Sequence, residues 1–131
     1  MQNLLMNSDK KKVLILDDDF SSRKLLSQLI RNNFNCEVSQ SDDGSDALKM
    51  MLQDPPDVLI LDMVMPFMSG VQVLQTMRKN QRLSQIPVFA CTSIDDNNVV
   101  QQIIKLGVRE YIKKPIKKEQ VLEKLNAVFS A

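Results

Sequence analysis

Histidine is absent from the 131-residue chain, and this absence excludes several kinds of chemistry at once. The chain can form no histidine-based catalytic triad and no histidine-ligated metal site, and it cannot carry a phosphohistidine of its own. Cysteine occurs only twice, as Cys36 and Cys91, far apart and in apolar surroundings. That usage is typical of buried thiols in a reducing compartment, so we expect a cytoplasmic protein without a disulfide.

Long apolar runs and an excess of charge are also lacking. No apolar stretch approaches the ~20 residues that cross a membrane, so we expect no membrane partner. The start, MQNLLMNSDKKK, has its charges after its short apolar stretch, the reverse of a secretory signal. The formal net charge of +1 offers no general attraction for nucleic acid, and we expect no direct binding to it.

Length and composition predict one globular domain. The 131 residues fall a little short of an average domain of about 150 residues. The 44% of apolar residues and 25% of charged residues are ordinary globular values. Residues 1–10 are predicted to form a disordered or frayed tail, and residues 11–131 the folded domain.

Two kinds of segment alternate along the predicted domain. Short apolar runs, the pattern of buried strands, occupy residues 13–16, 58–61 and 88–91, with weaker runs at 36–39 and 109–112. The longer stretches that follow them repeat apolar residues three and four apart, as helices do. Because the three strongest runs are apolar throughout, they indicate a parallel sheet covered on both faces. The pattern predicts an α/β fold, a doubly wound five-stranded parallel sheet built from five β/α units.

Polar residues stand at the ends of the predicted strands, where sheets of this kind bind ligands. They are Asp17-Asp18-Asp19, Asp62, Thr92 and Lys114. Taken singly, each fits a solvated turn or a helix cap. Taken together, crowded carboxylates repel one another unless a cation joins them, and oxygen ligands without histidine or cysteine favour Mg²⁺. With an ammonium and a hydroxyl nearby, such a site suits phosphoryl transfer to a carboxylate.

At these residues the chain resembles a known family, the receiver domain of two-component response regulators. The resemblance covers about residues 11–130 and rests on four motifs in family-like order and spacing: VLILDDDFSSRKLL, LILDMVMPFMSG, PVFACTS and YIKKPI. It implies the (βα)5 flavodoxin-like receiver fold, in the single-domain form of chemotaxis regulators. The implied function is a phosphorylation-dependent signalling switch, acting alone or within a phosphorelay, and not an enzyme.

The resemblance also implies a role for each residue of the predicted site. Asp62 is the phosphoacceptor, and Mg²⁺ is held by Asp17, Asp18, Asp62 and the backbone carbonyl of Val64. Thr92 and Lys114 contact the phosphoryl group, while Thr92 and Tyr111 form the conformational switch. Asp19 is expected at the start of a helix rather than on the metal, and the Lys114–Pro115 peptide is expected to be cis.

Partners follow from the same resemblance. The phosphoryl donor is expected to be a sensor histidine kinase or a phosphotransfer protein, and the signal is expected to pass to a downstream protein target. The regulator is expected to act as a monomer or as a phosphorylation-dependent dimer. In the family the first helix docks on the donor; here that helix carries Leu25, Leu26, Leu29 and Ile30. We expect most of this apolar face in the core and one or two residues free for the donor.

Two apolar residues depart from the commonest family pattern. Val64 stands two residues after the phosphoacceptor, and Ile94 stands two residues after Thr92. In the family these positions flank the path of the water that attacks the aspartyl phosphate, and polar side chains there help to orient it. We therefore expect slow self-dephosphorylation.

Two other interpretations stay open from the sequence. Asp17-x-Asp19 after an apolar strand is similar to the motif of haloacid-dehalogenase phosphatases, in which Asp17 would be the nucleophile. The second alternative is a pseudo-receiver, a scaffold that binds partners without being phosphorylated. The acidic trio, Thr92 and Lys114 argue against the pseudo-receiver, and the short chain argues against the phosphatase.

Overall fold

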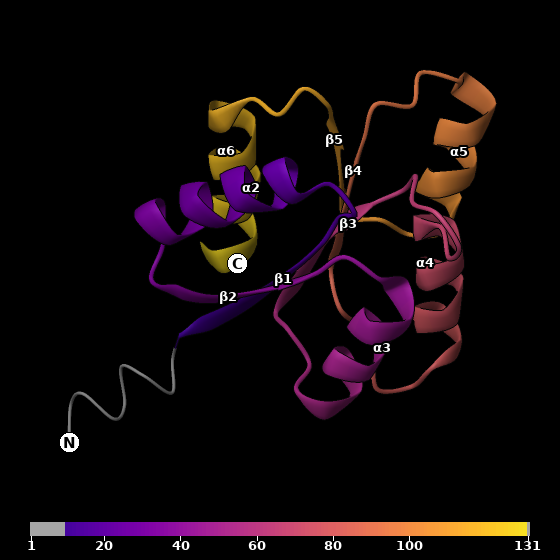
Figure 1. Cartoon of the computed structure of the whole chain (residues 1–131), viewed down its shortest axis with the longest axis horizontal. Coiled ribbons are helices and arrows are strands. Elements are labelled where there is room, and N and C mark those ends of the chain that lie inside the picture. The colour runs from indigo at the N-terminus through magenta and orange to yellow at the C-terminus, as the bar shows by residue number, and fades with distance from the viewer. Residues whose placement is uncertain (1–9, 131) are drawn as a thin grey trace.

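The computed structural model describes residues 10–130, in which five parallel strands form one sheet (Figure 1). Its strand order is β2-β1-β3-β4-β5. The strands are β1 (Lys11–Leu16), β2 (Cys36–Ser41), β3 (Val58–Asp62), β4 (Val88–Thr92) and β5 (Glu110–Lys113). The predicted doubly wound sheet is therefore confirmed. Residues 1–9 of the predicted tail lie outside the described residues.

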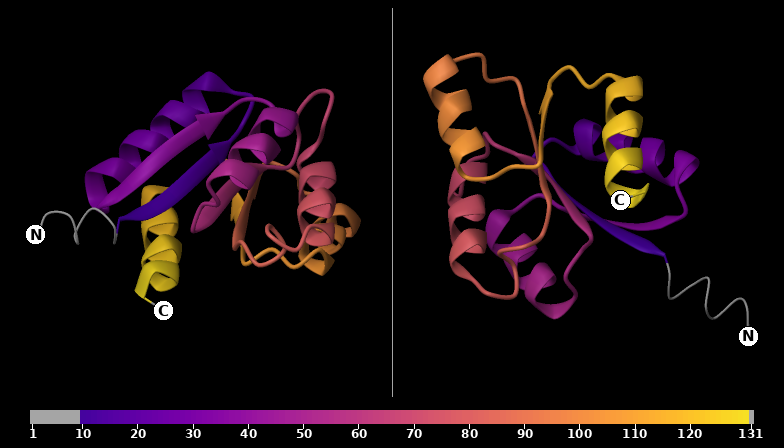
Figure 2. Two further views of the ribbon diagram at one scale, coloured as in Figure 1. Left: turned by 90° about the horizontal axis from the view of Figure 1, so that it is seen from below. Right: turned by 180° about the vertical axis from the view of Figure 1, so that it is seen from behind.

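Within the described part of the chain, five helices cover the two faces of the sheet (Figures 1 and 2). Helices α2 (Phe20–Asn33) and α6 (Lys118–Ser130) contact each other on one face. The other face carries α3 (Gly44–Gln53), α4 (Gly70–Lys79) and α5 (Asn97–Lys105). This arrangement leaves the carboxyl edge of the sheet open, and the loops at that edge hold the polar residues discussed below.

The core has two layers because successive side chains of a strand point to opposite faces. Val13 and Ile15 of β1 belong to the apolar cluster that includes α2 and α6. Leu14 and Leu16, which alternate with them, belong to the cluster that includes α3, α4 and α5. The central strands are therefore apolar on both faces, as their continuous hydrophobic runs predict.

Strands β3 and β4 each extend one residue beyond their apolar runs, to Asp62 and Thr92. Pairing continues there because the backbone ladder does not require apolar side chains: Asp62 is in register with Cys91, and Thr92 with Lys113. These two polar residues are consequently parts of the sheet rather than of the loops that follow. Both are buried, with 6% of Asp62 and 1% of Thr92 exposed.

Arg78, near the end of α4, connects three segments by hydrogen bonds, on the side of the sheet opposite its carboxyl edge. Its guanidinium donates hydrogen bonds to the carbonyls of Ser84 (3.0 Å), Leu106 (2.9 Å) and Gly107 (3.0 Å). Burial lowers the pKa of this guanidinium, and within residues 10–130 no carboxylate forms an ion pair with it. The role of Arg78 is therefore to satisfy carbonyls where two helices end.

Replacing Arg78 by methionine is expected to lower the free energy of unfolding by about 2–4 kcal/mol, because several carbonyls lose their donor. Chemical denaturation of the parent and Arg78→Met proteins measures the difference. Arg82→Met is the matched control, since Arg82 is exposed. Equal stability of the Arg78→Met and Arg82→Met proteins would contradict the role assigned to Arg78.

Candidate functional site

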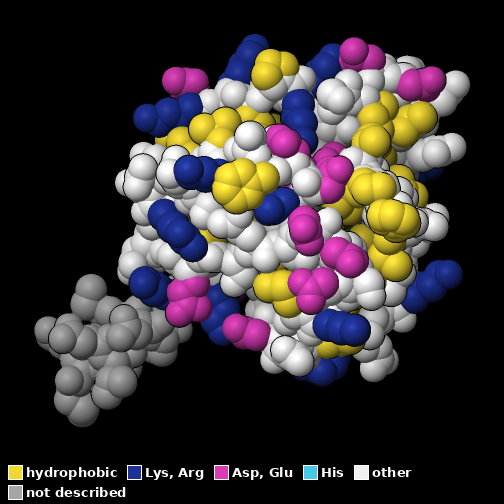
Figure 3. All heavy atoms as spheres, in the orientation of Figure 1, with side chains coloured by type: hydrophobic (Ala, Val, Ile, Leu, Met, Phe, Trp, Pro, Cys, Tyr) yellow, Lys and Arg dark blue, Asp and Glu magenta, His cyan; other side chains and the backbone are white. Residues whose placement is uncertain are grey.

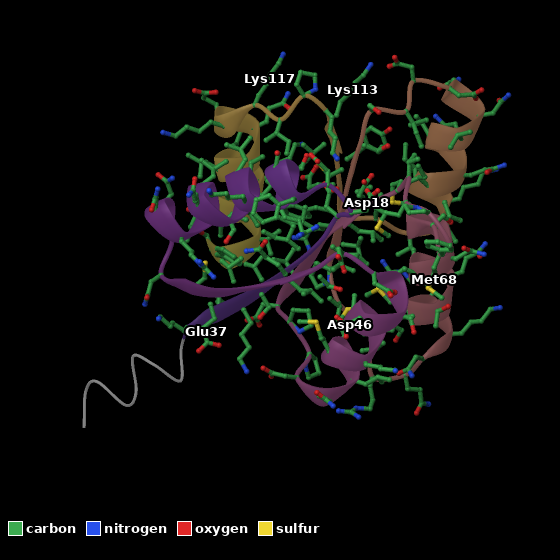
Figure 4. The ribbon with its side chains drawn as sticks, viewed as in Figure 1. Asp18, Glu37, Asp46, Met68, Lys113 and Lys117 are labelled. Atoms are coloured by element: carbon green, nitrogen blue, oxygen red, sulfur yellow. The ribbon has the colours of Figure 1, made fainter. Side chains whose placement is uncertain are left out.

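Three carboxylates meet at the carboxyl edge of the sheet. Asp17 and Asp18 follow β1, and Asp62 ends β3; each offers one oxygen, and these oxygens all lie within 4.8 Å of one another. Asp17 and Asp62 are buried, whereas Asp18 is exposed. Figure 4 shows Asp18 in the middle of the molecule, near the strand ends. The sequence-based expectation that β1 and β3 bring these side chains together agrees with this geometry.

Four hydrogen bonds fix Asp17 in place. Its Oδ1 accepts a hydrogen bond from the Asp19 N–H at 2.9 Å, and its Oδ2 accepts one from Lys114 Nζ at 2.9 Å. Its backbone N–H donates to the carbonyl of Ser41, and its own carbonyl accepts from Arg23 Nη1 at 2.7 Å. The carboxylate is therefore fixed in place, with only 2% of the residue exposed.

Arg23 is the site residue that the sequence reasoning missed. It lies in the first turn of α2, and its guanidinium carbon is 5.7 Å from the centre of the Phe20 ring. Its hydrogen bond to the Asp17 carbonyl makes it a positioning residue for the acidic loop. The only available signal was an arginine soon after the acidic run, which is also common on solvated helix faces.

The surroundings of Asp62 disfavour the charged form of its carboxyl group. Burial, and to a smaller extent the nearby Asp17 charge, raises the pKa of Asp62 to about 6. The hydrogen bond from the Val64 N–H and the charge of Lys114 act in the opposite direction but do not cancel this rise. The Val64 N–H donates to Asp62 Oδ1 at 3.1 Å, so one oxygen is oriented by the loop that follows β3. At neutral pH Asp62 is ionised, but its charge is poorly compensated, and an added cation would relieve it.

Among residues 10–130, Lys114 is the lysine that forms ion pairs with the carboxylates of the site. Its Nζ lies 2.9 Å from Asp17 Oδ2 and 3.7 Å from Asp62 Oδ2, and its side chain is 21% exposed. Burial alone would lower its pKa, but the hydrogen bond to Asp17 and the charges of Asp17 and Asp62 raise the pKa overall. Lys114 therefore stays protonated. The Lys114–Pro115 peptide is cis, as the resemblance implied.

The other two predicted residues lie on β4 and β5. Thr92 ends β4, and its Oγ1 accepts a hydrogen bond from the Ile94 N–H at 3.3 Å. The carbonyl of the same Ile94 accepts a hydrogen bond from the Tyr111 hydroxyl at 3.0 Å. A single residue of the β4–α5 loop thus connects Thr92 with the half-buried Tyr111.

Asp19 and Cys91 lie close by without belonging to the carboxylate group. Asp19 is the N-cap of α2, where its side chain accepts from the Ser22 N–H at 3.0 Å, as expected for a helix start. Cys91 pairs with Asp62 across the sheet, and burial raises the pKa of its thiol to about 12. That thiol stays protonated at neutral pH and is not a competing nucleophile.

The donor set fits a hard divalent cation. It consists of carboxylate oxygens from Asp17, Asp18 and Asp62, two of which are buried beside each other with one ammonium to balance them. Oxygen ligands of this kind suit Mg²⁺, which keeps part of its water shell and so leaves positions for phosphate oxygens.

Addition of Mg²⁺ is expected to raise the melting temperature of the parent protein by several degrees, because the ion binds the folded state alone. Asp62→Asn removes one of the crowded charges, so this variant is expected to be more stable than the parent without metal and to gain less from Mg²⁺. Thermal unfolding with and without Mg²⁺ measures both effects. An equal rise for parent and variant would place the ion elsewhere.

The chain is similar to known proteins over nearly all its length. Residues 13–126 match the response regulator receiver domain. The chain is 30% identical to the chemotaxis protein CheY of Pseudomonas aeruginosa over 90% of its length and 95% of the relative's. It is 32% identical to the probable chemotaxis protein CheY of Rhizobium etli, over 95% of this chain and 96% of that one.

The fold is shared with solved structures as well. The chemotaxis response regulator CheY4 of Vibrio cholerae superposes with a TM-score of 0.83, at 28% identity, over 91% of this chain and 98% of the other. Among the residues that the structure describes, no helix has the length and apolar character needed to span a membrane.

Proposed function

Because the chain belongs to the family of response regulator receiver domains, we propose that it is a switch whose Asp62 takes a phosphoryl group from a partner's phosphohistidine. One observation carries the proposal: Asp62 ends β3 with Asp17, Asp18 and Lys114 around it. A buried, ionised carboxylate beside further carboxylates and one ammonium is suited to accept a phosphoryl group rather than to hold the fold together.

The transfer is a displacement at phosphorus. An oxygen of Asp62 forms a bond to the phosphorus, the bond from phosphorus to the donor's imidazole nitrogen breaks, and its electron pair stays on that nitrogen. The chain supplies positioning and charge: the Val64 N–H orients one Asp62 oxygen, and Lys114 Nζ lies 3.7 Å from the other. The groups that would hold Mg²⁺ are the side chains of Asp17, Asp18 and Asp62 and the carbonyl of Val64. When bound, the ion offsets the negative charge of the carboxylates and of the phosphoryl oxygens.

The signal would leave the site through the β4–α5 loop. An aspartyl phosphate adds negative charge and acceptor oxygens next to β4. In this proposal the Thr92 hydroxyl turns toward the phosphoryl group, and its contact with the Ile94 N–H changes. Because Ile94 also holds the Tyr111 hydroxyl, a shift of this loop reaches the surface of β5.

In this proposal the protein acts between a phosphoryl donor and a downstream target. The donor is a sensor histidine kinase or a phosphotransfer protein, since the chain itself has no histidine. The phosphorylated domain, residues 11–131, then acts in the cytoplasm on a downstream protein, as a monomer or as a dimer formed on phosphorylation.

Incubation with acetyl phosphate and Mg²⁺, followed by intact-mass measurement, tests the proposed function. The parent is expected to gain one phosphoryl group, and Asp62→Asn to gain none. Cys91→Ser is a matched control, because Cys91 is the neighbour of Asp62 in the sheet but has no role in the transfer. A parent that stays unmodified, or an Asp62→Asn variant that is modified equally, would overturn the proposal.

A further inference from the structure

Arg23 is bonded to both ends of the acidic segment that runs from Asp17 to Asp19. Its backbone N–H donates to the carbonyl of Asp19 at 3.1 Å, and its Nη1 donates to the carbonyl of Asp17 at 2.7 Å. One residue thus holds the segment against the first turn of α2, through its main chain and through its side chain. The two bonds give Arg23 a direct hold on the backbone from which the site's carboxylates project.

The carbonyl that Arg23 Nη1 contacts belongs to the peptide unit that joins Asp17 to Asp18. Because a peptide unit is planar, a hydrogen bond to its oxygen also fixes the direction of the Asp18 N–H and the position of the Asp18 Cα. Asp18 itself is exposed and, within residues 10–130, forms no ion pair. The orientation of its carboxylate relative to that of Asp17 therefore depends on this peptide plane.

The guanidinium of Arg23 is held in place in its turn. Asp19 is the N-cap of α2, and its carboxylate accepts hydrogen bonds from the Ser22 N–H at 3.0 Å and from the Ser22 hydroxyl at 2.7 Å. Phe20 stands three residues before Arg23 on the same helix, with its ring centre 5.7 Å from the guanidinium carbon. A ring at this distance attracts the cation and limits the positions that the arginine side chain can take.

A positive charge beside a cation site has two opposing effects on the binding of a cation. In Figure 3 acidic side chains gather in the centre of the visible face, with basic side chains next to them. Within residues 10–130, Arg23 forms no ion pair, and its guanidinium bonds to the carbonyl of Asp17 instead. Its charge repels a bound cation, whereas ligands fixed in the right orientation favour one. Because the two effects have opposite signs, a binding measurement separates them.

We infer that Arg23 is a positioning residue for Mg²⁺: it fixes the peptide between Asp17 and Asp18, and this effect outweighs the repulsion from its own charge. The inference rests on the proposed function, in which Asp17 and Asp18 hold the ion. Groups that orient metal ligands without touching the metal typically change metal affinity by about 10- to 100-fold. Repulsion between partly exposed charges is weaker, because water and salt screen it.

Titration of the unphosphorylated protein with Mg²⁺, followed by nuclear magnetic resonance, tests the inference. Arg23→Met removes the donor and the charge, and we expect its dissociation constant for Mg²⁺ to rise on the order of tenfold. Arg23→Lys keeps a charge and a donor, so its affinity is expected between those of the parent and Arg23→Met. Lys24→Met is the matched control, because Lys24 is exposed and, within residues 10–130, forms no ion pair. Its affinity should stay within about twofold of the parent's.

The amide of Asp19 provides a second readout that needs no metal. Its N–H donates to Asp17 Oδ1 at 2.9 Å, a bond that spans the same peptide plane. In the metal-free protein, solvent exchange of this amide is expected to be several-fold faster in Arg23→Met than in the parent, because the segment opens more often. Lys24→Met should exchange at the parent's rate.

The outcomes distinguish this inference from the proposed function. Equal or tighter Mg²⁺ binding by Arg23→Met would mean that charge repulsion dominates, and it would overturn the inference alone. Exchange of the Asp19 amide at the parent's rate in Arg23→Met would do the same. A parent that binds no Mg²⁺ would instead overturn the magnesium site of the proposed function, and with it the role of Arg23 toward the ion.

Discussion

Gly70→Ala is expected to destabilise the fold and to impair phosphorylation of Asp62 at the same time. Gly70 is the first residue of α4, and a Cβ built on it would lie 2.3 Å from the carbonyl oxygen of Asp62 and 2.6 Å from the Cα of Met63. Both neighbours are backbone atoms, so no side-chain rotation relieves the clash. Either α4 or the end of β3 must move, and β3 carries the phosphoacceptor.

We expect Gly70→Ala to lower the free energy of unfolding by on the order of 3 kcal/mol, at the upper end of the usual cost of overpacking. Chemical denaturation measures the loss, and acetyl phosphate labelling measures the effect on Asp62. Gly107→Ala is the control: its φ is +79°, but a Cβ there meets nothing closer than 3.7 Å. Strain alone should cost that variant about 1 kcal/mol and leave labelling intact. Parent-like stability and labelling of Gly70→Ala would contradict the close approach of α4 to β3.

The aspartyl phosphate of the parent is expected to hydrolyse slowly, and polar substitutions at Val64 and Ile94 are expected to shorten its lifetime. The backbone N–H groups of these residues bond to Asp62 and Thr92, so both residues are fixed beside the phosphorylation site. Their side chains are apolar and offer no acceptor to a water molecule that approaches the phosphorus. Val64 is 57% exposed, and by the family resemblance its position flanks the path of such a water.

Val64→Asn combined with Ile94→Glu is expected to speed hydrolysis at least about tenfold, because oriented water reacts faster than unoriented water. Loss of radiolabel after removal of the donor measures the rate in both proteins. Leu25→Asn serves as the control, since it replaces an exposed apolar side chain on α2 rather than in the loops after β3 and β4. A parent phosphoryl lifetime of seconds, unchanged by the double substitution, would contradict this account of Val64 and Ile94.

The sheet and most of the acidic site could be predicted from the sequence because their signals are local. Continuous apolar runs mark strands buried on both faces, and the polar residue that ends each run marks the edge where ligands bind. Asp17, Asp18, Asp62 and Lys114 were located in this way, and the structure brings their side chains together. Thr92 was marked by its place at a strand end too, whereas its switch role and that of Tyr111 came from the family resemblance alone.

Other features depend on contacts between residues distant in sequence. Arg78 donates hydrogen bonds to the carbonyls of Leu106 and Gly107, and the local sequence around Arg78 does not predict these partners. The loop after β3 contains Met63, Met65 and Phe67, which look alike as apolar residues. The structure buries both methionines and turns Phe67 outward through its positive φ. Backbone conformation of this kind is set by the whole loop and not by the identity of one residue.

Mapping the phosphorylated residue tests the central claim most directly. The parent is labelled with acetyl phosphate and Mg²⁺, reduced with borohydride to convert the aspartyl phosphate into homoserine, and digested for peptide sequencing by mass spectrometry. The account predicts conversion at residue 62 alone, with Asp17 intact because both of its carboxylate oxygens already accept hydrogen bonds. Conversion at residue 17, the nucleophile of the phosphatase alternative, would contradict it.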